Sequence, residues 1–180
     1  SLVESFIERQ SKSGIGMSHN SLKLFSYLEF LEKSEPALFT SSRIKVLEIG
    51  AGLFNFGHML AAEVSEFEFI VCDLPELIPA AYEEITEKYT LTGVDRYDVF
   101  LPHELNSFFS SDSKRKLLFA LPTQLDVIES TGWRFNLFVN HESFGEMPKD
   151  TVNGYLKNVH DLGAKGSTVF MVNRLLRIQE

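Results

Sequence analysis

The sequence predicts an α/β fold: a Rossmann-like, doubly wound and mostly parallel sheet flanked by helices. Short apolar runs alternate along the chain with segments whose apolar residues recur at helical spacing. Such an alternation is typical of parallel strands joined by right-handed crossovers. In addition, a glycine pair directly follows the first apolar run, and an aspartate directly follows the second. Because ligands of these sheets bind beyond the carboxyl ends of the strands, the residues after each strand are candidates for a binding site.

The composition is that of an ordinary globular chain. Of its 180 residues, 44% are hydrophobic and 23% are charged, and the formal net charge is −8. One domain over residues 1–180 is therefore expected. Neither a membrane span nor a nucleic-acid partner is expected, since the one basic cluster is Lys114-Arg115-Lys116. A single cysteine, Cys72, allows no disulfide within the chain, and its apolar neighbours predict a buried thiol. These features favour a cytoplasmic location.

Residues 1–40 are expected to form a helical lead-in and lid region, and residues 41–180 the α/β core. The helix before the core is indicated by four apolar residues at helical spacing: Leu22, Phe25, Leu28 and Leu31. Ser18 or Asn20 can cap the N-terminus of this helix. His19 and Asn20 could also form part of a lid over a ligand.

Five strands are expected in the core. They are the apolar runs over 44–49, 67–72, 116–121, 135–140 and 167–172. Residues 97–101 could also form a strand, but the order of elements after 116–121 favours the latter. The stretch 95–115 is therefore interpreted as an insertion with its own short helix. Before the last strand, Asp150 can cap a helix that Gly163 ends as a C′ residue.

The turn after the first strand, Gly50-Ala51-Gly52, leads into a helix. Glycines at this place let the backbone turn sharply and approach a ligand closely, which a β-carbon would block. Asp73 follows the second strand, where a carboxylate can accept both hydroxyl protons of a ribose. Taken alone, Asp73 could equally be a helix cap or turn residue. Together with the glycine turn, it predicts a site for an adenosine-containing cofactor.

The residues around the glycine turn favour S-adenosylmethionine over a dinucleotide. Leu53 and Phe54 are bulky where a pyrophosphate-binding loop is small. Glu48, two residues before the first glycine, would repel a pyrophosphate. The same carboxylate suits a ligand that bears a sulfonium and an ammonium group. The cofactor that these residues predict is therefore S-adenosylmethionine.

Two stretches resemble known families. The segment 48–52 together with Asp73 is similar to the first motif and the acidic residue of class I S-adenosylmethionine-dependent methyltransferases. The segments 121–125 and 135–147 resemble a family of sugar O-methyltransferases, in which a strand ending in Asn leads into a Ser-Phe-x-Glu-Met segment. The likeness runs over about 43–173. It implies a seven-stranded methyltransferase fold, of which this chain would lack the last strands.

The resemblance also implies roles for individual residues. The methionine part of the cofactor would lie against Gly50 and Gly52, and its ribose against Asp73. The adenine would be bordered by four residues: Leu74, Pro122, Thr123 and Gln124. Asn140 and His141, after the fourth strand, would face the sulfonium and the acceptor.

Methyl transfer to a hydroxyl needs a base, and His141 is the first candidate because an ordinary imidazole titrates near neutral pH. A loop histidine that only bonds backbone is the alternative. Glu142 and Glu146 could orient His141 or bind sugar hydroxyls, or simply form a charged turn. A metal site of these three residues is conceivable, but no second metal-type cluster appears, so no metal is expected. His58 and His103 are assigned to surface or helix-start positions.

Two other classes of function are weighed beside methyl transfer. An inactive cofactor-binding domain that acts as a partner subunit would fit the displacement of the third motif glycine to Gly57 and the missing last strands. A nicotinamide-dependent oxidoreductase is disfavoured by Leu53, Phe54 and Glu48. The expected partner of the enzyme is a small-molecule acceptor, a sugar or glycoside, and a homo-oligomer is left open.

Overall fold

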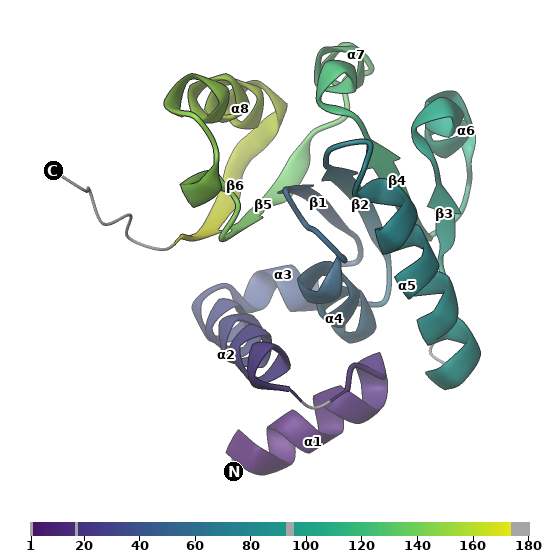
Figure 1. The fold of residues 1–180 in the computed structure, drawn as a ribbon, viewed down its shortest axis with the longest axis vertical. Helices are drawn as coiled ribbons and strands as arrows, with labels where there is room; N and C mark the ends of the chain where they lie inside the picture. The colour runs from purple at the N-terminus through teal and green to yellow at the C-terminus, as the bar shows by residue number, and fades with distance from the viewer. Residues whose placement is uncertain (1, 17, 93–95, 174–180) are drawn as a thin grey trace, which may run out of the picture.

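The computed structural model describes residues 2–16, 18–92 and 96–173. Within these ranges, six strands form one sheet in the order β3-β4-β2-β1-β5-β6, and every neighbouring pair is parallel (Figure 1). The strands are β1 (Ile44–Ile49), β2 (Phe67–Cys72), β3 (Asp98–Phe100), β4 (Arg115–Ala120), β5 (Phe135–His141) and β6 (Gly163–Val172). The predicted fold class is therefore confirmed.

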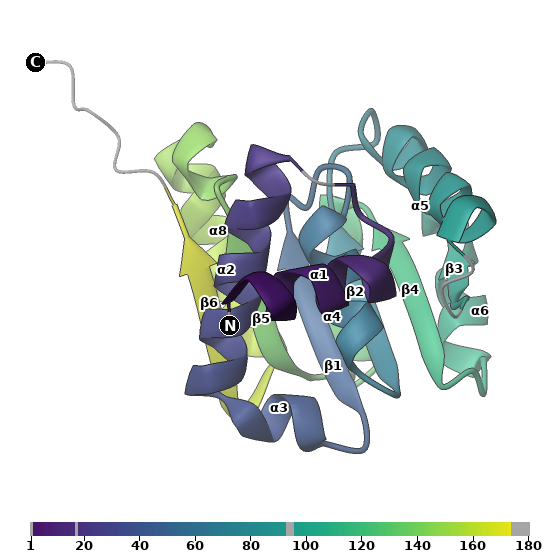
Figure 2. The same ribbon diagram turned by 90° about the horizontal axis from the view of Figure 1, so that it is seen from below.

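Helices cover both faces of the sheet (Figures 1 and 2). The face that carries Val46 and Leu137 packs against α2 (His19–Ser34), α3 (Pro36–Thr40), α4 (Asn55–Glu63) and α5 (Ile78–Thr92). Helix α1 (Leu2–Ser13) lies outside this layer, against α4 and α2. The opposite face, which carries Leu47 and Phe138, packs against α6 (Leu105–Ser110), α7 (Leu125–Ser130) and α8 (Lys149–Leu162). None of the helices in the described ranges is long and apolar enough to cross a membrane.

The central strands β1 and β2 have the bounds that their apolar runs predict. Both lie between neighbouring strands and under helices on both faces, so nearly every side chain is buried, including all of β2. Cys72, the last residue of β2, is a buried thiol as expected. β1 ends where Gly50 adopts a left-handed conformation with φ +72°, which breaks the extended geometry.

The stretch before β4 corrects one interpretation. The short helix expected in 95–115 is present as α6, but the stretch also contains strand β3. Asp98–Phe100 pairs with Lys116–Leu118 of β4 at the edge of the sheet. An edge strand needs only one neighbour, so 97–101 and 116–121 are not alternatives. Both segments contribute strands.

The boundary between α8 and β6 also differs from expectation. β6 begins at Gly163, which pairs with Phe135, instead of at residue 167. Gly163 has φ −72° and is extended, so the helix ends without a left-handed C′ glycine. At the other end, Pro148 takes the N-cap position and Asp150 lies in the first turn. There a negative charge is still favourable toward the helix dipole.

The helix α2 begins as predicted at Ser18, whose side chain accepts a hydrogen bond from the Ser21 backbone N (3.0 Å). Ser21 Oγ in return accepts from the Ser18 backbone N (2.7 Å), which completes a capping box. The buried face of the helix differs from the prediction only at its first turn. Leu22 is 46% exposed, whereas Leu24 is buried and joins Phe25 in the core.

His58 corrects another assignment, because it is buried at 1% exposure rather than at the surface. Its Nε2 lies 3.1 Å from the Ser13 carbonyl oxygen, and its Nδ1 lies 2.8 Å from the Tyr97 hydroxyl oxygen. A carbonyl can only accept, so Nε2 carries a proton and, in the neutral ring, Nδ1 accepts from Tyr97. His58 thereby ties α1 and α4 to the segment before β3. His103 lies in a short 3-10 turn, Pro102–Glu104, as a helix-start position.

Candidate functional site

A cavity of about 560 Å³ lies at the carboxyl ends of β1, β2 and β5. After β1 the chain builds strands on one side of it, and only with β5 does it cross to the other side. The cavity therefore occupies the switch in strand order, where open α/β sheets bind their ligands. Eleven of the residues considered in the sequence line it: Asn20, Glu48, Gly50, Ala51, Gly52, Leu53, Asp73, Leu74, His141, Glu142 and Glu146.

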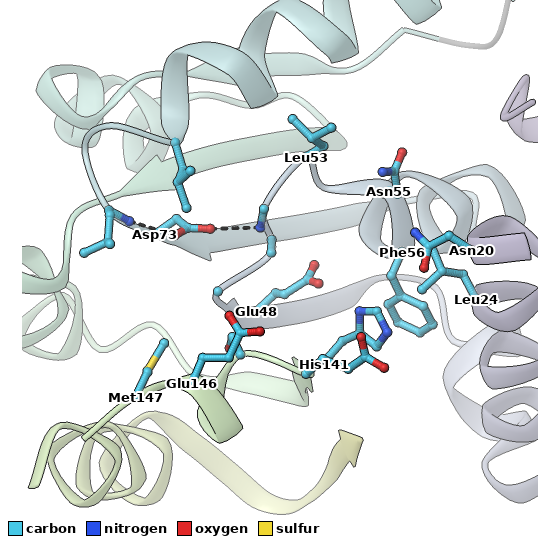
Figure 3. Close-up of a pocket in the computed structure, with 17 residues that line it drawn as sticks. Asn20, Leu24, Glu48, Leu53, Asn55, Phe56, Asp73, His141, Glu146 and Met147 are labelled. Atoms are coloured by element: carbon cyan, nitrogen blue, oxygen red, sulfur yellow. Dashed lines mark hydrogen bonds between the residues drawn. The ribbon is translucent and has the colours of Figure 1, made fainter. Parts of the chain in front are cut away.

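The cavity has two ends (Figure 3). Asp73 lies at one end, and Asn20, Leu24 and His141 lie at the other, with Glu48 between them. The first end belongs to the turn after β2, and the second is shared by the end of β5 and the helix α2. One part of a ligand can therefore bind at the Asp73 end of the cavity, and another part at the end formed by β5 and α2.

Asp73 is held against the glycine turn. Its Oδ2 accepts a hydrogen bond from the Gly52 backbone N (2.9 Å), and its Oδ1 accepts one from the Leu74 backbone N (2.8 Å). Burial raises the pKa of Asp73, while these two backbone bonds oppose that rise. Each carboxylate oxygen retains a further lone pair, so Asp73 can still accept hydrogen bonds from hydroxyl groups of a ligand.

Gly52 needs no side chain and leaves room for a ligand. It has φ +56°, and no atom lies within 4 Å of the place where its β-carbon would stand. The backbone at this point therefore borders the cavity without a screen of side-chain atoms. This supports the reason for which the glycine turn was selected in the sequence.

Phe54 is not a bulky obstacle in the turn, because its ring points into the core. Phe54 has a left-handed backbone (φ 58°) and is fully buried, with its ring edge-on to Phe69 at 5.3 Å between centroids. A β-carbon on Gly57 would overlap the Phe54 ring. Gly57, the glycine that stands late in the motif, therefore makes room for Phe54. Leu53, by contrast, is 43% exposed and lines the cavity.

Glu48 has a buried carboxyl group that faces the cavity. It is 1% exposed, and its Oε2 has no hydrogen-bond partner among the described residues. Burial, with a smaller contribution from the negative charge of Asp73, raises the pKa of Glu48 to about 8. A buried polar atom without a partner is costly unless a ligand or water satisfies it. Glu48 is thus suited to a cationic or hydrogen-bond-donating group.

Asn140 is fully buried and is not among the residues that line the cavity. Its Nδ2 donates to the Ile49 carbonyl (2.9 Å) and to Ser143 Oγ (2.6 Å). Side chains alternate along a strand, so Asn140 and His141 point to opposite faces. Asn140 therefore joins the end of β5 to the end of β1, and its contact with the sulfonium stays a prediction.

The residues Pro122, Thr123 and Gln124 form a 3-10 turn after β4 and also lie outside the lining of the cavity. β4 is separated from β1 by β2, which places this turn beyond the Asp73 turn. The Gln124 side chain is engaged locally: Oε1 accepts from the Leu121 backbone N (2.8 Å), and Nε2 donates to the Pro102 carbonyl (2.8 Å). A role beside the adenine stays a prediction for these residues.

The end of β5 places His141 and Glu142 at the cavity. The His141 ring meets the Tyr27 ring of α2 edge-on, with 5.4 Å between centroids. Glu142 Oε1 accepts from Lys23 Nζ of the same helix at 2.9 Å. The Glu142 backbone is left-handed, with φ 63°, a conformation that costs a residue with a β-carbon about 1–2 kcal/mol. Non-glycine residues in this region cluster at functional sites.

Sequence reasoning missed several lining residues: Leu24, Asn55, Phe56, Leu77, Ser143 and Met147. Asn20 was considered for a lid, but its place in the wall depends on how α2 packs. Some signal was available, because Asn20, Lys23, Leu24 and Tyr27 follow the helical spacing of one face. The sequence pattern alone does not reveal that this face covers the end of β5.

The charges of the cavity have one sign. Among the described residues that line it, four are carboxylic acids and none is Lys or Arg: Glu48, Asp73, Glu142 and Glu146. Such a lining attracts a cationic ligand and disfavours a pyrophosphate. In the part of the chain that the structure describes, no three His, Cys, Asp or Glu side chains converge as metal ligands would.

No family model and no curated protein matches this chain. Solved structures do match its fold. An S-adenosylmethionine-dependent methyltransferase of Agrobacterium tumefaciens aligns with a TM-score of 0.53 at 12% identity, over 85% of this chain and 46% of that one. A hypothetical protein of Thermus thermophilus gives a TM-score of 0.53 at 18% identity, over 87% and 76% of the two chains.

A glycopeptide N-methyltransferase in complex with S-adenosylmethionine aligns with a TM-score of 0.50 at 15% identity, over 87% of this chain and 55% of that one. The chain thus spans about half the length of these two methyltransferases. At such low identities the likeness concerns the fold, which is the Rossmann-like fold of S-adenosylmethionine-dependent methyltransferases.

Proposed function

We propose that this chain binds S-adenosylmethionine and transfers its methyl group to a hydroxyl of a small molecule, a sugar or a glycoside. One observation carries the choice of cofactor. Glu48 presents a buried carboxyl oxygen without a partner beside the glycine turn, in a cavity lined by acids and by no Lys or Arg among its described residues. The ammonium and sulfonium of S-adenosylmethionine match this lining, whereas the pyrophosphate of a dinucleotide does not.

The adenosine is assigned to the end of the cavity at Asp73. The Asp73 carboxylate would accept the ribose hydroxyls, next to the Gly52 backbone that it already binds. Three apolar side chains of the lining are exposed by 43–54% and offer surface for the adenine: Leu53, Leu74 and Leu77. The methionine part would then lie along the glycine turn, with its ammonium at Glu48.

The acceptor is assigned to the end of the cavity at α2. S-adenosylmethionine supplies an electrophilic methyl group, and the chain must align an acceptor oxygen with it. His141 lies at this end and would accept the hydroxyl proton as general base. Asn20, Asn55 and Glu142 provide amide and carboxylate groups that can bind hydroxyls. This mixture of hydrogen-bonding groups with the apolar Phe56 supports a sugar or glycoside.

The first test is calorimetric titration of the chain with S-adenosylhomocysteine, with NAD as the comparison ligand. We expect micromolar binding of S-adenosylhomocysteine alone. Asp73→Asn should weaken that binding roughly ten- to a hundredfold, because the amide accepts fewer hydrogen bonds from the ribose than a carboxylate. Asp112→Asn is the matched control, since Asp112 is exposed and precedes β4 at the opposite edge of the sheet.

The second test is methyl transfer from labelled S-adenosylmethionine to a panel of sugars and glycosides, with His141→Asn beside the wild type. The proposed chemistry is supported if the His141→Asn variant turns over more slowly than the wild type and binds S-adenosylhomocysteine with unchanged affinity. Binding without turnover on any acceptor would favour an inactive cofactor-binding subunit. Absence of S-adenosylhomocysteine binding to the wild type would refute the cofactor assignment itself.

A further inference from the structure

Helix α2 presents four residues of one face to the site: Asn20, Lys23, Leu24 and Tyr27. Asn20 and Leu24 line the cavity (Figure 3), while Lys23 and Tyr27 contact the two residues at the end of β5. Residues three, four and seven positions apart share a helix face, so these contacts belong to one surface. The helix thus reaches the acceptor end of the cavity both directly and through β5.

The ion pair between Lys23 and Glu142 is a long-range contact. Lys23 Nζ lies 2.9 Å from Glu142 Oε1, and the two side chains are 26% and 22% exposed. Lys33 and Glu29, on the same helix, form an ordinary pair four residues apart, in which the lysine is 72% exposed. Partial burial reduces solvent screening, so the Lys23 pair constrains its partners more than the Lys33 pair does.

Glu142 is the residue whose backbone needs such a constraint. Among the described residues, only Phe54 and Glu142 are non-glycine residues with positive φ. Glu142 is fixed on one side by a hydrogen bond from its backbone N to the Val172 carbonyl (2.6 Å), and on the other by Lys23. Because this turn directly follows His141, a change in its conformation would move the end of β5 that carries the imidazole.

We infer that Lys23 is a positioning residue for His141: it holds Glu142 in its left-handed turn and so fixes the imidazole at the acceptor end of the cavity. Tyr27, one helical turn later, supports the same ring from its edge. The consequence for turnover rests on the proposed function. The link between Lys23 and His141 is a property of the chain without any ligand, and it can be tested separately.

The test is NMR of the histidine Cε1–Hε1 signals of the full chain, with the His141 signal assigned through His141→Asn. Lys23→Met should shift and broaden the His141 signal and leave the His58 signal unchanged. Lys33→Met is the matched control and should alter neither signal. Lys23→Arg, and the exchanged pair Lys23→Glu with Glu142→Lys, should restore the wild-type His141 signal.

Two results would overturn the inference. One is a His141 signal that is the same in the Lys23→Met variant as in the Lys33→Met control. The other is a change that the exchanged pair does not reverse, since the effect would then not pass through Glu142.

Once an acceptor has been identified, Lys23→Met should lower kcat roughly tenfold or more while the Kd for S-adenosylhomocysteine stays within about twofold. Misplacement of a reacting group slows the reaction but does not affect cofactor binding. Failure of the wild type to bind S-adenosylhomocysteine would refute the proposed function and leave the NMR result to decide on Lys23.

Discussion

The side chain of Ser143 occupies the space beside Gly50 in which a β-carbon would stand. Ser143 Oγ donates to the Ile49 carbonyl (3.1 Å) and accepts from Asn140 Nδ2 (2.6 Å), so the segment after β5 is fastened to the end of β1. These bonds hold the ends of β1 and β5, which border the cavity, against each other. The site therefore depends on the smallness of Gly50 as well as on its backbone conformation.

This contact predicts that Gly50→Ala is more harmful than its backbone conformation alone explains. Gly132→Ala is the matched control, because Gly132 has a similar φ (+78° against +72°) but no atom within 4 Å of its β-carbon position. We expect Gly132→Ala to lower the free energy of unfolding by about 1 kcal/mol. Gly50→Ala should lower it by roughly 3 kcal/mol or more and weaken S-adenosylhomocysteine binding. Equal losses in urea unfolding would contradict the role assigned to Ser143.

Gly57 allows a similar comparison within helices. Replacing an exposed helical glycine by alanine normally stabilises a protein by about 0.5–1 kcal/mol, and Gly154→Ala in α8 should do so. Gly57→Ala in α4 should instead destabilise, because the new methyl group would overlap the buried Phe54 ring. Thermal unfolding of the two variants checks the opposite signs. A Gly57→Ala variant as stable as the wild type would show that Phe54 can move at little cost.

Glu48 predicts a pH dependence of stability. Its folded pKa of about 8 exceeds the ordinary value, so between pH 4.5 and about 8 folding takes up a proton. Stability from this group is complete below the unfolded pKa and falls as the pH rises through the folded pKa, by an amount on the order of a few kcal/mol. Glu48→Gln should remove this slope, so the variant gains on the wild type from pH 5 to pH 8 in urea unfolding.

The same substitution should weaken S-adenosylhomocysteine binding, since an amide cannot pair with the ammonium as a carboxylate does. Together the two effects predict a variant that is more stable at pH 8 but binds less well. Parallel stability curves for wild type and variant across this pH range would contradict the buried, protonated state of Glu48 in the unliganded chain.

Substitution of His58 should lower the stability of the chain without changing its ligand affinity. It joins Ser13 and Tyr97 from a buried position far along the chain from both, and it does not line the cavity. His58→Phe keeps an aromatic ring but removes the hydrogen bonds to the Ser13 carbonyl and the Tyr97 hydroxyl, at a cost of roughly 2–4 kcal/mol. The Tm should fall while S-adenosylhomocysteine affinity is unchanged. His160→Ala, at an exposed position of α8, should leave both unchanged.

The sequence by itself determined the elements whose signal is local. β1 and β2 have their predicted bounds because each is a mostly apolar run ended by Gly50 or Asp73. The parallel sheet then places those end residues at one edge, which is why the sequence predicts Glu48, Gly50 and Asp73 as neighbours in a site. The strand at 97–101 was considered but set aside, and β6 was expected to begin at 167 and not at Gly163, because edge strands carry a weak pattern.

Only the tertiary structure decided which neighbours these residues have. Asn140 and His141 are adjacent in the chain, yet strand alternation buries one and turns the other to the cavity, and no local pattern indicates which face is which. Lys23 and Glu142 are 119 positions apart, so their contact arises from the packing of α2 over the sheet. Hydrophobic periodicity indicates which face of a single helix or strand is buried. A functional site also depends on how separate helices and strands pack against one another.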